Sequence, residues 1–208
     1  MNRLQLILLI FLSGTTALLG VWTDMHKVTA TDGLADDWFG LAVAIDGDYA
    51  VVGSYQDSND NGSDAGAAYI FHRSGTTWTE QAKLTASDGN SQDYFGVSVS
   101  IDGDYVVIGA TRGDGNQTDS GSAYVFVRDG SNWTEQAELT ASDGSGGDQF
   151  GKVSISGDYI IIGARENGST GSAYIFHREG TTWTEEDQIF GSDGSSNDKF
   201  GQSVCIDG

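Results

Sequence analysis

The sequence contains no proline, a single cysteine, and only 10 lysine and arginine residues against 30 aspartate and glutamate residues. The lone Cys205 excludes an internal disulfide framework, so packing alone must hold the fold together. The excess of negative charge argues against nucleic acid and anionic membranes as partners, because their phosphates would be repelled. Without proline, the tight turns must be formed by the 30 glycines and by asparagine and aspartate residues.

Long apolar runs are also scarce, and the one pronounced run lies at the N-terminus. Arg3 precedes an apolar stretch over residues 4–12, and small and polar residues follow up to Gly20. This stretch is shorter than the roughly 20 residues that cross a bilayer. We therefore predict that residues 1–20 are a cleaved signal peptide and that residues 21–208 are secreted or lie on the extracellular face of the cell surface. A retained membrane anchor is the alternative.

Repetition is the strongest feature of the chain. Phe-Gly recurs at Phe39, Phe95, Phe150 and Phe200, and Trp78, Trp133 and Trp183 follow the same rhythm. A period of roughly fifty residues with strand-like content is typical of β-propellers and similar arrays. In such arrays a single repeat cannot bury its own apolar faces, so neighbouring repeats must pack against one another. The tryptophans are therefore interpreted as packing residues, with stacking on carbohydrate as the alternative.

Each repeat is predicted to form a four-stranded antiparallel meander. In the repeat that begins at Phe95, branched and small residues alternate over 97–101, which indicates an inner strand. Residues 105–108 are wholly apolar, residues 123–127 predict a third strand, and the more polar residues 133–139 suit an outer edge strand. The predicted fold class is all-β, a β-propeller of four-stranded antiparallel blades.

The repeats place the predicted blades at about 39–86, 95–141 and 150–190. Residues 22–31 match an isolated outer strand, and residues 200–206 match the first strand of a further blade. We therefore expect an incomplete arc of about three blades plus flanking single strands, taken from a longer propeller. Exposed blade faces at the two ends would favour self-association.

The repeat resembles a known family at three places. These are the Phe-Gly pair, the apolar second strand that ends in Gly109-Ala110, and the Gly-Ser-Ala-Tyr run over 121–124. Together they resemble the FG-GAP repeats of the integrin α-subunit N-terminal propeller, over residues 22–208. The resemblance implies a seven-bladed propeller, an extracellular location and a role in adhesion or ligand binding. The family's calcium motif is not carried over, because the turn at 102–104 is too short to surround an ion that takes 6–8 oxygens.

The sequence contains no Ser-His-Asp set, no histidine cluster and no phosphate-binding loop. We therefore predict a non-enzymatic scaffold that recognises an extracellular protein or glycan ligand, with no nucleic-acid partner. A structural surface array is one alternative. The other is an accessory propeller of an enzyme whose catalytic part lies outside this sequence.

One loop offers a candidate metal site. Asp57, Asn59 and Asn61 follow the spacing at the start of a calcium-binding loop, and Asp64 adds a further oxygen ligand. The closing bidentate glutamate is absent, because Ala68 stands at the twelfth place. Calcium is the only cofactor that the sequence suggests, and a solvated, turn-rich loop is the alternative.

Acidic residues gather in the loops after the second and fourth strands, which share one edge of an up-and-down blade. The predicted ligand-contacting residues of this edge are Asp88, Asp93, Asp114, Asp119, Asp143 and Asp148. Pairs five residues apart suit either backbone capping of a tight loop or a shared cation site. Four Asn-X-Ser/Thr sequons, at Asn61, Asn116, Asn132 and Asn167, predict glycosylation in a eukaryotic host.

Overall fold

The structure is a computed structural model that describes residues 26–208, a range that holds twelve β-strands and no helix. The predicted signal peptide, residues 1–20, lies outside the described residues. The strands are β1 (Val43–Asp46), β2 (Tyr49–Ser54), β3 (Ala67–Ser74), β4 (Thr77–Leu84), β5 (Phe95–Asp102), β6 (Tyr105–Ala110), β7 (Ser122–Asp129), β8 (Asn132–Leu139), β9 (Phe150–Ser156), β10 (Tyr159–Ala164), β11 (Ser172–Glu179) and β12 (Thr182–Ile189). No helix long and apolar enough to span a membrane is found from residue 26 onward.

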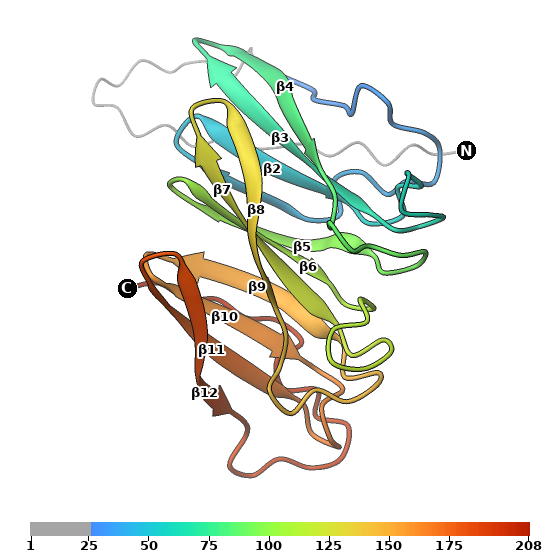
Figure 1. Cartoon of the computed structure of the whole chain (residues 1–208), viewed down its shortest axis with the longest axis vertical. Helices are drawn as coiled ribbons and strands as arrows, with labels where there is room; N and C mark the ends of the chain where they lie inside the picture. The colour runs from blue at the N-terminus through green and yellow to red at the C-terminus, as the bar shows by residue number, and fades with distance from the viewer. Residues whose placement is uncertain (1–25) are drawn as a thin grey trace, which may run out of the picture.

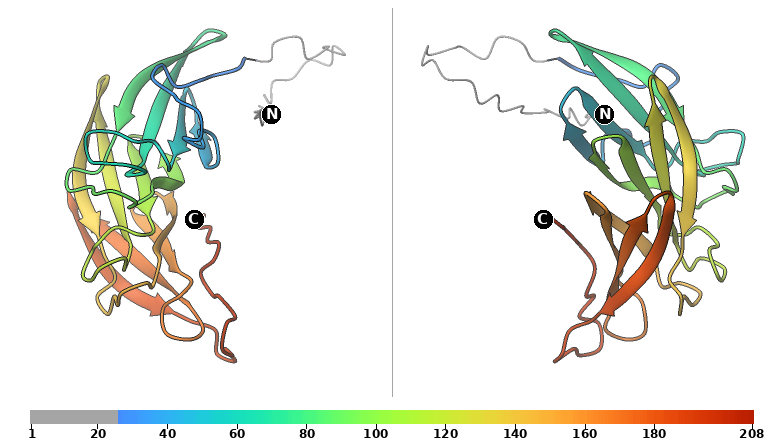
Figure 2. Two further views of the ribbon diagram at one scale, coloured as in Figure 1. Left: turned by 90° about the vertical axis from the view of Figure 1, so that its right-hand side faces the viewer. Right: turned by 60° about the vertical axis from the view of Figure 1, so that its left-hand side comes forward.

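The strands form three four-stranded antiparallel sheets, each in chain order. We call them blade 1 (β1–β4), blade 2 (β5–β8) and blade 3 (β9–β12). The blades stack face to face along a curved, open arc, with blade 1 at one end and blade 3 at the other (Figures 1 and 2). The predicted all-β, propeller-type fold class is confirmed.

Burial follows the order of the strands within each blade. The second strands are nearly pure apolar runs because both of their faces are covered; in β6, Val106, Val107 and Ile108 are 0% exposed. The outer strands β4, β8 and β12 are polar and mostly half-buried or exposed. Two apolar clusters fill the spaces between blades, and each draws its members from two adjacent blades. The blades therefore share their cores, as the repeat pattern predicts.

The Phe-Gly pairs at Phe95, Phe150 and Phe200 dock onto the preceding blade through their backbone. The amide of Phe95 donates to the Ala65 carbonyl at 2.9 Å, and Phe95 forms a parallel bridge with Gly66. Phe95 is 1% exposed, and its ring lies against Tyr124 of its own blade at a tilt of 58°, with the ring centroids 5.4 Å apart. The amides of Phe150 and Phe200 make the same hydrogen bond to the blade before them.

The docked Phe-Gly backbone leaves no room for a side chain at the glycine near the end of the second strand of the preceding blade. A Cβ built at Gly109 would lie 1.8 Å from the carbonyl oxygen of Gly151, and one at Gly53 would lie 1.9 Å from that of Gly96. Glycine is therefore required at these two positions by close approach of another chain segment rather than by its torsion angles.

Polar contacts join adjacent blades near their outer edges. The Arg128 guanidinium lies over the Tyr49 ring of blade 1 at 4.3 Å and donates to the Tyr49 hydroxyl. The indole nitrogen of Trp133 donates to Gln81 of blade 1 at 3.0 Å. Arg178 and Trp183 repeat both contacts between blades 2 and 3. This confirms that the tryptophans at 133 and 183 pack between blades. A cation–π contact contributes about 1 kcal/mol, less than the ~2–3 kcal/mol from burying one phenylalanine.

The described parts of the two predicted flanking strands form no strand. Within 22–31 the described part, 26–31, has no strand, and Val28 and Ala30 instead pack against the open face of blade 1. Residues 200–206 also form no strand. Phe200 docks on blade 3 and the amide of Ile206 donates to Ser154, but no second strand pairs with this segment in the described chain. A lone strand without a hydrogen-bonded neighbour is not stable by itself.

We predict that Gly109→Ala destabilises the fold by about 3 kcal/mol or more, because the new methyl group would collide with backbone rather than with a movable side chain. Gly130→Ala is the matched control, since Gly130 has a φ of +63° but nothing within 4 Å of its Cβ position. It should cost only about 1 kcal/mol. Urea unfolding followed by tryptophan fluorescence measures both, and equal losses would contradict the close-approach argument.

Candidate functional site

The loops after the second and fourth strands lie together along one side of the arc (Figure 1). We call this edge the rim; it comprises residues 55–66, 111–121 and 165–171, together with 31–42, 85–94, 140–149 and 190–199. The two kinds of loop contact each other directly. The Asn61 side chain donates to the Ala86 carbonyl at 2.8 Å, and the amide of Gln92 donates to the Ser63 carbonyl at 2.9 Å. The rim is therefore a continuous surface.

Two of the predicted rim aspartates cap the backbone of their own loops. A carboxylate oxygen of Asp93 accepts the amide of Asn90 at 2.6 Å, and Asp148 accepts that of Ser145 at 2.7 Å. Both aspartates are 5% exposed. The structure thus favours the capping interpretation for these positions over a shared cation site, and a ligand cannot reach their carboxylates freely.

Two further rim aspartates join adjacent blades. Asp88 accepts the hydroxyl of Tyr124 at 2.9 Å, and Asp143 accepts that of Tyr174 at 2.6 Å. Burial raises the pKa of both tyrosines, and the hydrogen bond to each carboxylate adds to the increase. Both hydroxyls therefore remain protonated donors. Of the predicted ligand residues, Asp88 and Asp143 are exposed to solvent despite these contacts, as are Asp114 and Asp119, whereas Asp93 and Asp148 are buried.

The candidate calcium loop is held by internal hydrogen bonds. Asp57 is 3% exposed, and one of its oxygens lies 2.8 Å from the Tyr69 hydroxyl and 3.0 Å from the Lys83 ammonium. Lys83 also binds Asp32 at 2.7 Å. Burial alone would lower the pKa of Lys83, but the two carboxylates raise it on balance. A protein ammonium group thus takes the place that a cation would need.

Two other proposed ligands of that loop also have partners. The side-chain oxygen of Asn59 accepts the backbone amide of Asn61 at 2.9 Å, and the side-chain nitrogen of Asn61 donates to the Ala86 carbonyl. At Asp64 the backbone amide donates to Ser58, and this bond leaves the carboxylate unengaged. In the part of the chain that the structure describes, no group of three acidic, histidine or cysteine side chains is placed to hold a metal ion. The residues do not fit a calcium cage as they stand, and calcium binding remains a prediction that requires Lys83 to move away.

The four sequons differ in the freedom of their amide nitrogens. Those of Asn61 and Asn116 donate to backbone carbonyls, and that of Asn167 donates to Asp148. Asn132 is exposed at the start of β8. Glycosylation is therefore compatible with the folded geometry at Asn132, and elsewhere it would break a hydrogen bond of the scaffold.

One set of rim residues was missed by the sequence analysis. The residue before each Phe-Gly has a left-handed backbone: φ is 56° at Trp38, 61° at Tyr94, 57° at Gln149 and 58° at Lys199. Non-glycine residues rarely adopt this conformation. Because the torsion is constant while the side chain changes from aromatic to amide to cation, the loop presents a different group at the same place in each repeat. The sequence feature that could have revealed these positions is the variable residue directly before the invariant Phe-Gly dipeptide.

The first two of these positions form an aromatic row with neighbouring residues. Trp38 is 53% exposed, and its ring centroid lies 6.1 Å from that of Tyr55. Tyr55 meets Tyr94 edge-on at 5.4 Å, and the Arg112 guanidinium lies 4.9 Å over the Tyr94 ring. Three aromatic rings and one cation from two adjacent blades thus form one row along the rim, which we call the aromatic row.

Comparison with known proteins gives the family. The sequence matches the FG-GAP repeat over residues 22–71, 78–126, 133–176 and 183–208. The chain belongs to the FG-GAP repeat family. A search of curated proteins finds no significant match. Among solved structures, Sqt1 of Saccharomyces cerevisiae is similar with 12% sequence identity and a TM-score of 0.48, over 77% of this chain and 37% of that chain. The FG-GAP chain therefore spans 37% of that neighbour's length.

In this FG-GAP rim, Asp93 is a buried acid with acidic neighbours. Burial raises its pKa from 3.8 to about 6, against the lowering effect of the hydrogen bond from Asn90, and the charges of Asp114, Asp88 and Asp119 raise it further. The folded chain therefore binds more protons than the unfolded chain between these two values. Folding stability should consequently fall as pH rises through that window.

We predict that Asp93→Asn removes this decline between pH 4 and 6 and raises the melting temperature by a few degrees at pH 7. The asparagine oxygen can still accept the amide of Asn90, while the buried charge is gone. Asp129→Asn, on an exposed hairpin turn, is the control for a lost surface carboxylate. Thermal unfolding across the pH range measures all three chains. A difference between Asp93→Asn and wild type that is the same at every pH would contradict the assignment.

Proposed function

We propose that this FG-GAP chain is an extracellular, non-enzymatic recognition scaffold that binds a glycan through the aromatic row. The observation that carries the proposal is the row itself, formed by Trp38, Tyr55 and Tyr94 with Arg112 at its end. Secretion rests on the predicted signal peptide over residues 1–20.

The chemistry of the row suits the face of a sugar ring. Aromatic rings offer a flat apolar surface to the C–H groups of a sugar, while the guanidinium donates several hydrogen bonds in a fixed plane to its hydroxyl groups. Arg112 already lies over the Tyr94 ring before any ligand binds, which reduces the side-chain entropy lost on binding. The row is also exposed at one end, since Trp38 is half accessible to solvent.

The arrangement of constant and variable residues supports binding at the rim. The capping aspartates are engaged in all four loops, so they belong to the frame. The side chains before Phe-Gly and the loops 55–66, 111–121 and 165–171 differ from repeat to repeat. Variable groups on a rigid frame are typical of a recognition surface.

The end faces of the arc favour a second candidate, a structural array formed by self-association. Leu34, Leu41, Val43 and Ile45 are exposed near blade 1, and Ile189, Phe190 and Phe200 are exposed near blade 3. Exposed apolar groups of this kind favour contacts between copies. Sedimentation velocity across a range of concentrations tests this candidate; a strictly monomeric chain at high micromolar concentration would contradict it.

For the glycan proposal, we predict that Trp38→Ala and Tyr94→Ala each weaken retention on a printed glycan array by about tenfold or more, in line with ~1–3 kcal/mol for one stacking contact. Phe190→Ala is the matched control, because Phe190 is 65% exposed but lies at the far end of the arc. It should leave binding unchanged.

Three results would oppose the glycan proposal. They are no retention of any glycan by the wild-type chain, equal retention by all variants, and loss of retention in the Phe190 control. Circular dichroism of each variant shows whether the β-sheet content is preserved.

A further inference from the structure

Lys152 departs from the repeat pattern on the inner strand of blade 3. It pairs with Gly163 in the register of the sheet, and the same place opposite Gly109 in blade 2 holds Ser98. A long cationic side chain therefore stands where the preceding repeat has a small hydroxyl. Such an exchange is notable in a chain with only 10 lysine and arginine residues.

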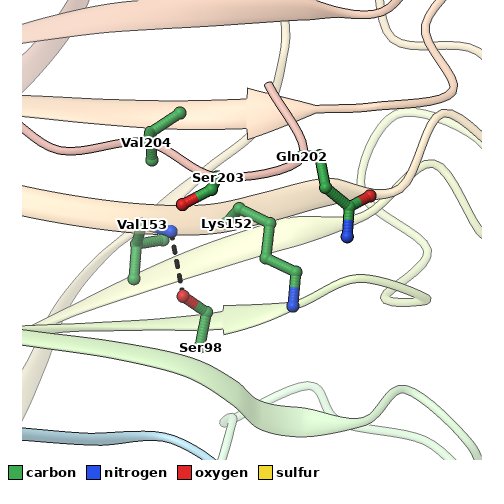
Figure 3. A pocket seen from close by; sticks show the side chains of 6 residues that line it. All are labelled: Ser98, Lys152, Val153, Gln202, Ser203 and Val204. Carbon is green, nitrogen blue, oxygen red and sulfur yellow. Dashed lines mark hydrogen bonds between the residues drawn. The ribbon is translucent and has the colours of Figure 1, made fainter. Parts of the chain in front are cut away.

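The side chain lies in a cavity of about 220 Å³ between β9 and the segment 200–206. The cavity is lined by Ser98, Lys152, Val153, Gln202, Ser203 and Val204 (Figure 3). Two valines form apolar walls, and the remaining four side chains carry hydrogen-bond donors.

The lining groups are oriented as donors. The side-chain oxygen of Gln202 accepts a hydrogen bond from the Arg165 guanidinium at 2.9 Å, so the side-chain amide nitrogen is oriented to donate. Figure 3 shows this nitrogen turned to the same side as the Lys152 ammonium group. The Ser98 hydroxyl oxygen accepts the amide of Val153 at 3.1 Å, which leaves its proton available to donate. The cavity therefore offers an ammonium, an amide and hydroxyl groups to one ligand.

The ammonium group has no counter-ion in the chain from residue 26 onward. None of the salt bridges there involves Lys152, and its charged neighbour is the cation Arg165. Burial lowers the pKa of Lys152, and the positive charge of Arg165 lowers it further. A partly buried cation beside another cation is stabilised by an anion.

We propose that this cavity, which we call the Lys152 cavity, binds a carboxylate group of a ligand. The carboxylate would accept from the Lys152 ammonium, the Gln202 amide and a serine hydroxyl, and these are the charge-assisted contacts that such anions favour. Its size fits one carboxylate with the few atoms that carry it. Two sources share this chemistry, an acidic sugar and the carboxylate of a peptide. The cavity lies apart from the aromatic row, so the inference does not rest on the glycan proposal.

Titration of the ¹⁵N-labelled full chain, followed by amide chemical shifts, tests the cavity with defined probes. Sodium glucuronate represents the acidic sugar and glucose is its neutral counterpart. Sodium N-acetylglycinate represents the peptide carboxylate and N-acetylglycinamide is its neutral counterpart. We use about 150 mM salt, where a Debye length of ~8 Å screens the distant negative charge of the chain.

We expect at least one of the two carboxylates to shift the amides of Val153 and Ser203 saturably, while neither neutral probe does. Lys152→Ser should weaken that binding at least tenfold, and it introduces the residue that the preceding repeat has at this place. Lys27→Ser is the matched control, since it removes the same charge from an exposed site far along the chain, and it should change the affinity less than twofold.

The outcome also identifies the source. Binding of glucuronate alone indicates an acidic sugar, binding of N-acetylglycinate alone indicates a peptide carboxylate, and binding of both supports a general carboxylate site. Equal shifts with charged and neutral probes, no shift with any probe, or equal affinity of wild type and Lys152→Ser would overturn the proposal.

Discussion

The close approach of each Phe-Gly backbone to the glycine-lined face of the preceding blade is the constraint on which the rest of the structure depends. The amide of Phe95 reaches the Ala65 carbonyl only because Gly53 and Gly66 carry no side chain that would obstruct it. This contact sets the spacing of the blades, and the phenylalanine ring then joins the shared apolar cluster between them. The tyrosine–arginine and tryptophan–glutamine contacts at the outer edge add smaller, geometry-dependent contributions to an interface that apolar burial already stabilises.

The same constraint explains much of the acidity of the rim. Loops that return tightly from one blade to the next leave backbone amides without strand partners, and aspartates such as Asp93 and Asp148 accept them. Glutamates on the outer strands do the same between blades, as Glu135 does for Ser87. Much of the net charge is therefore part of the scaffold. The groups that we propose for recognition are those whose identity varies from repeat to repeat, and they are aromatic at the blade 1 end and cationic near Lys152.

The sequence was sufficient to predict the blades, because their strand pattern depends on short-range alternation and on a period that recurs three times. It correctly favoured packing for Trp133, since the tryptophan follows a hairpin turn in every repeat. It failed for 26–31 and 200–206, because strand formation depends on a hydrogen-bonded partner and not only on the segment's own residues. It also could not decide what Asp57 does, since its partners Tyr69 and Lys83 come from other strands. The aromatic row escaped notice because its members meet across two blades and its geometry depends on a left-handed torsion at Trp38 and Tyr94.

The most direct test of this account is hydrogen exchange of the Phe95 and Phe150 amides in the full chain. If the Phe-Gly contact determines the stacking of blades, both amides should be protected to a degree similar to those of the central strands β6 and β10, because all of them exchange only when blades separate. The amide of Thr118, in an exposed rim loop, provides the unprotected reference. Exchange of Phe95 and Phe150 as fast as Thr118, with β6 and β10 still protected, would show that the blades fold without this contact and would contradict the central claim.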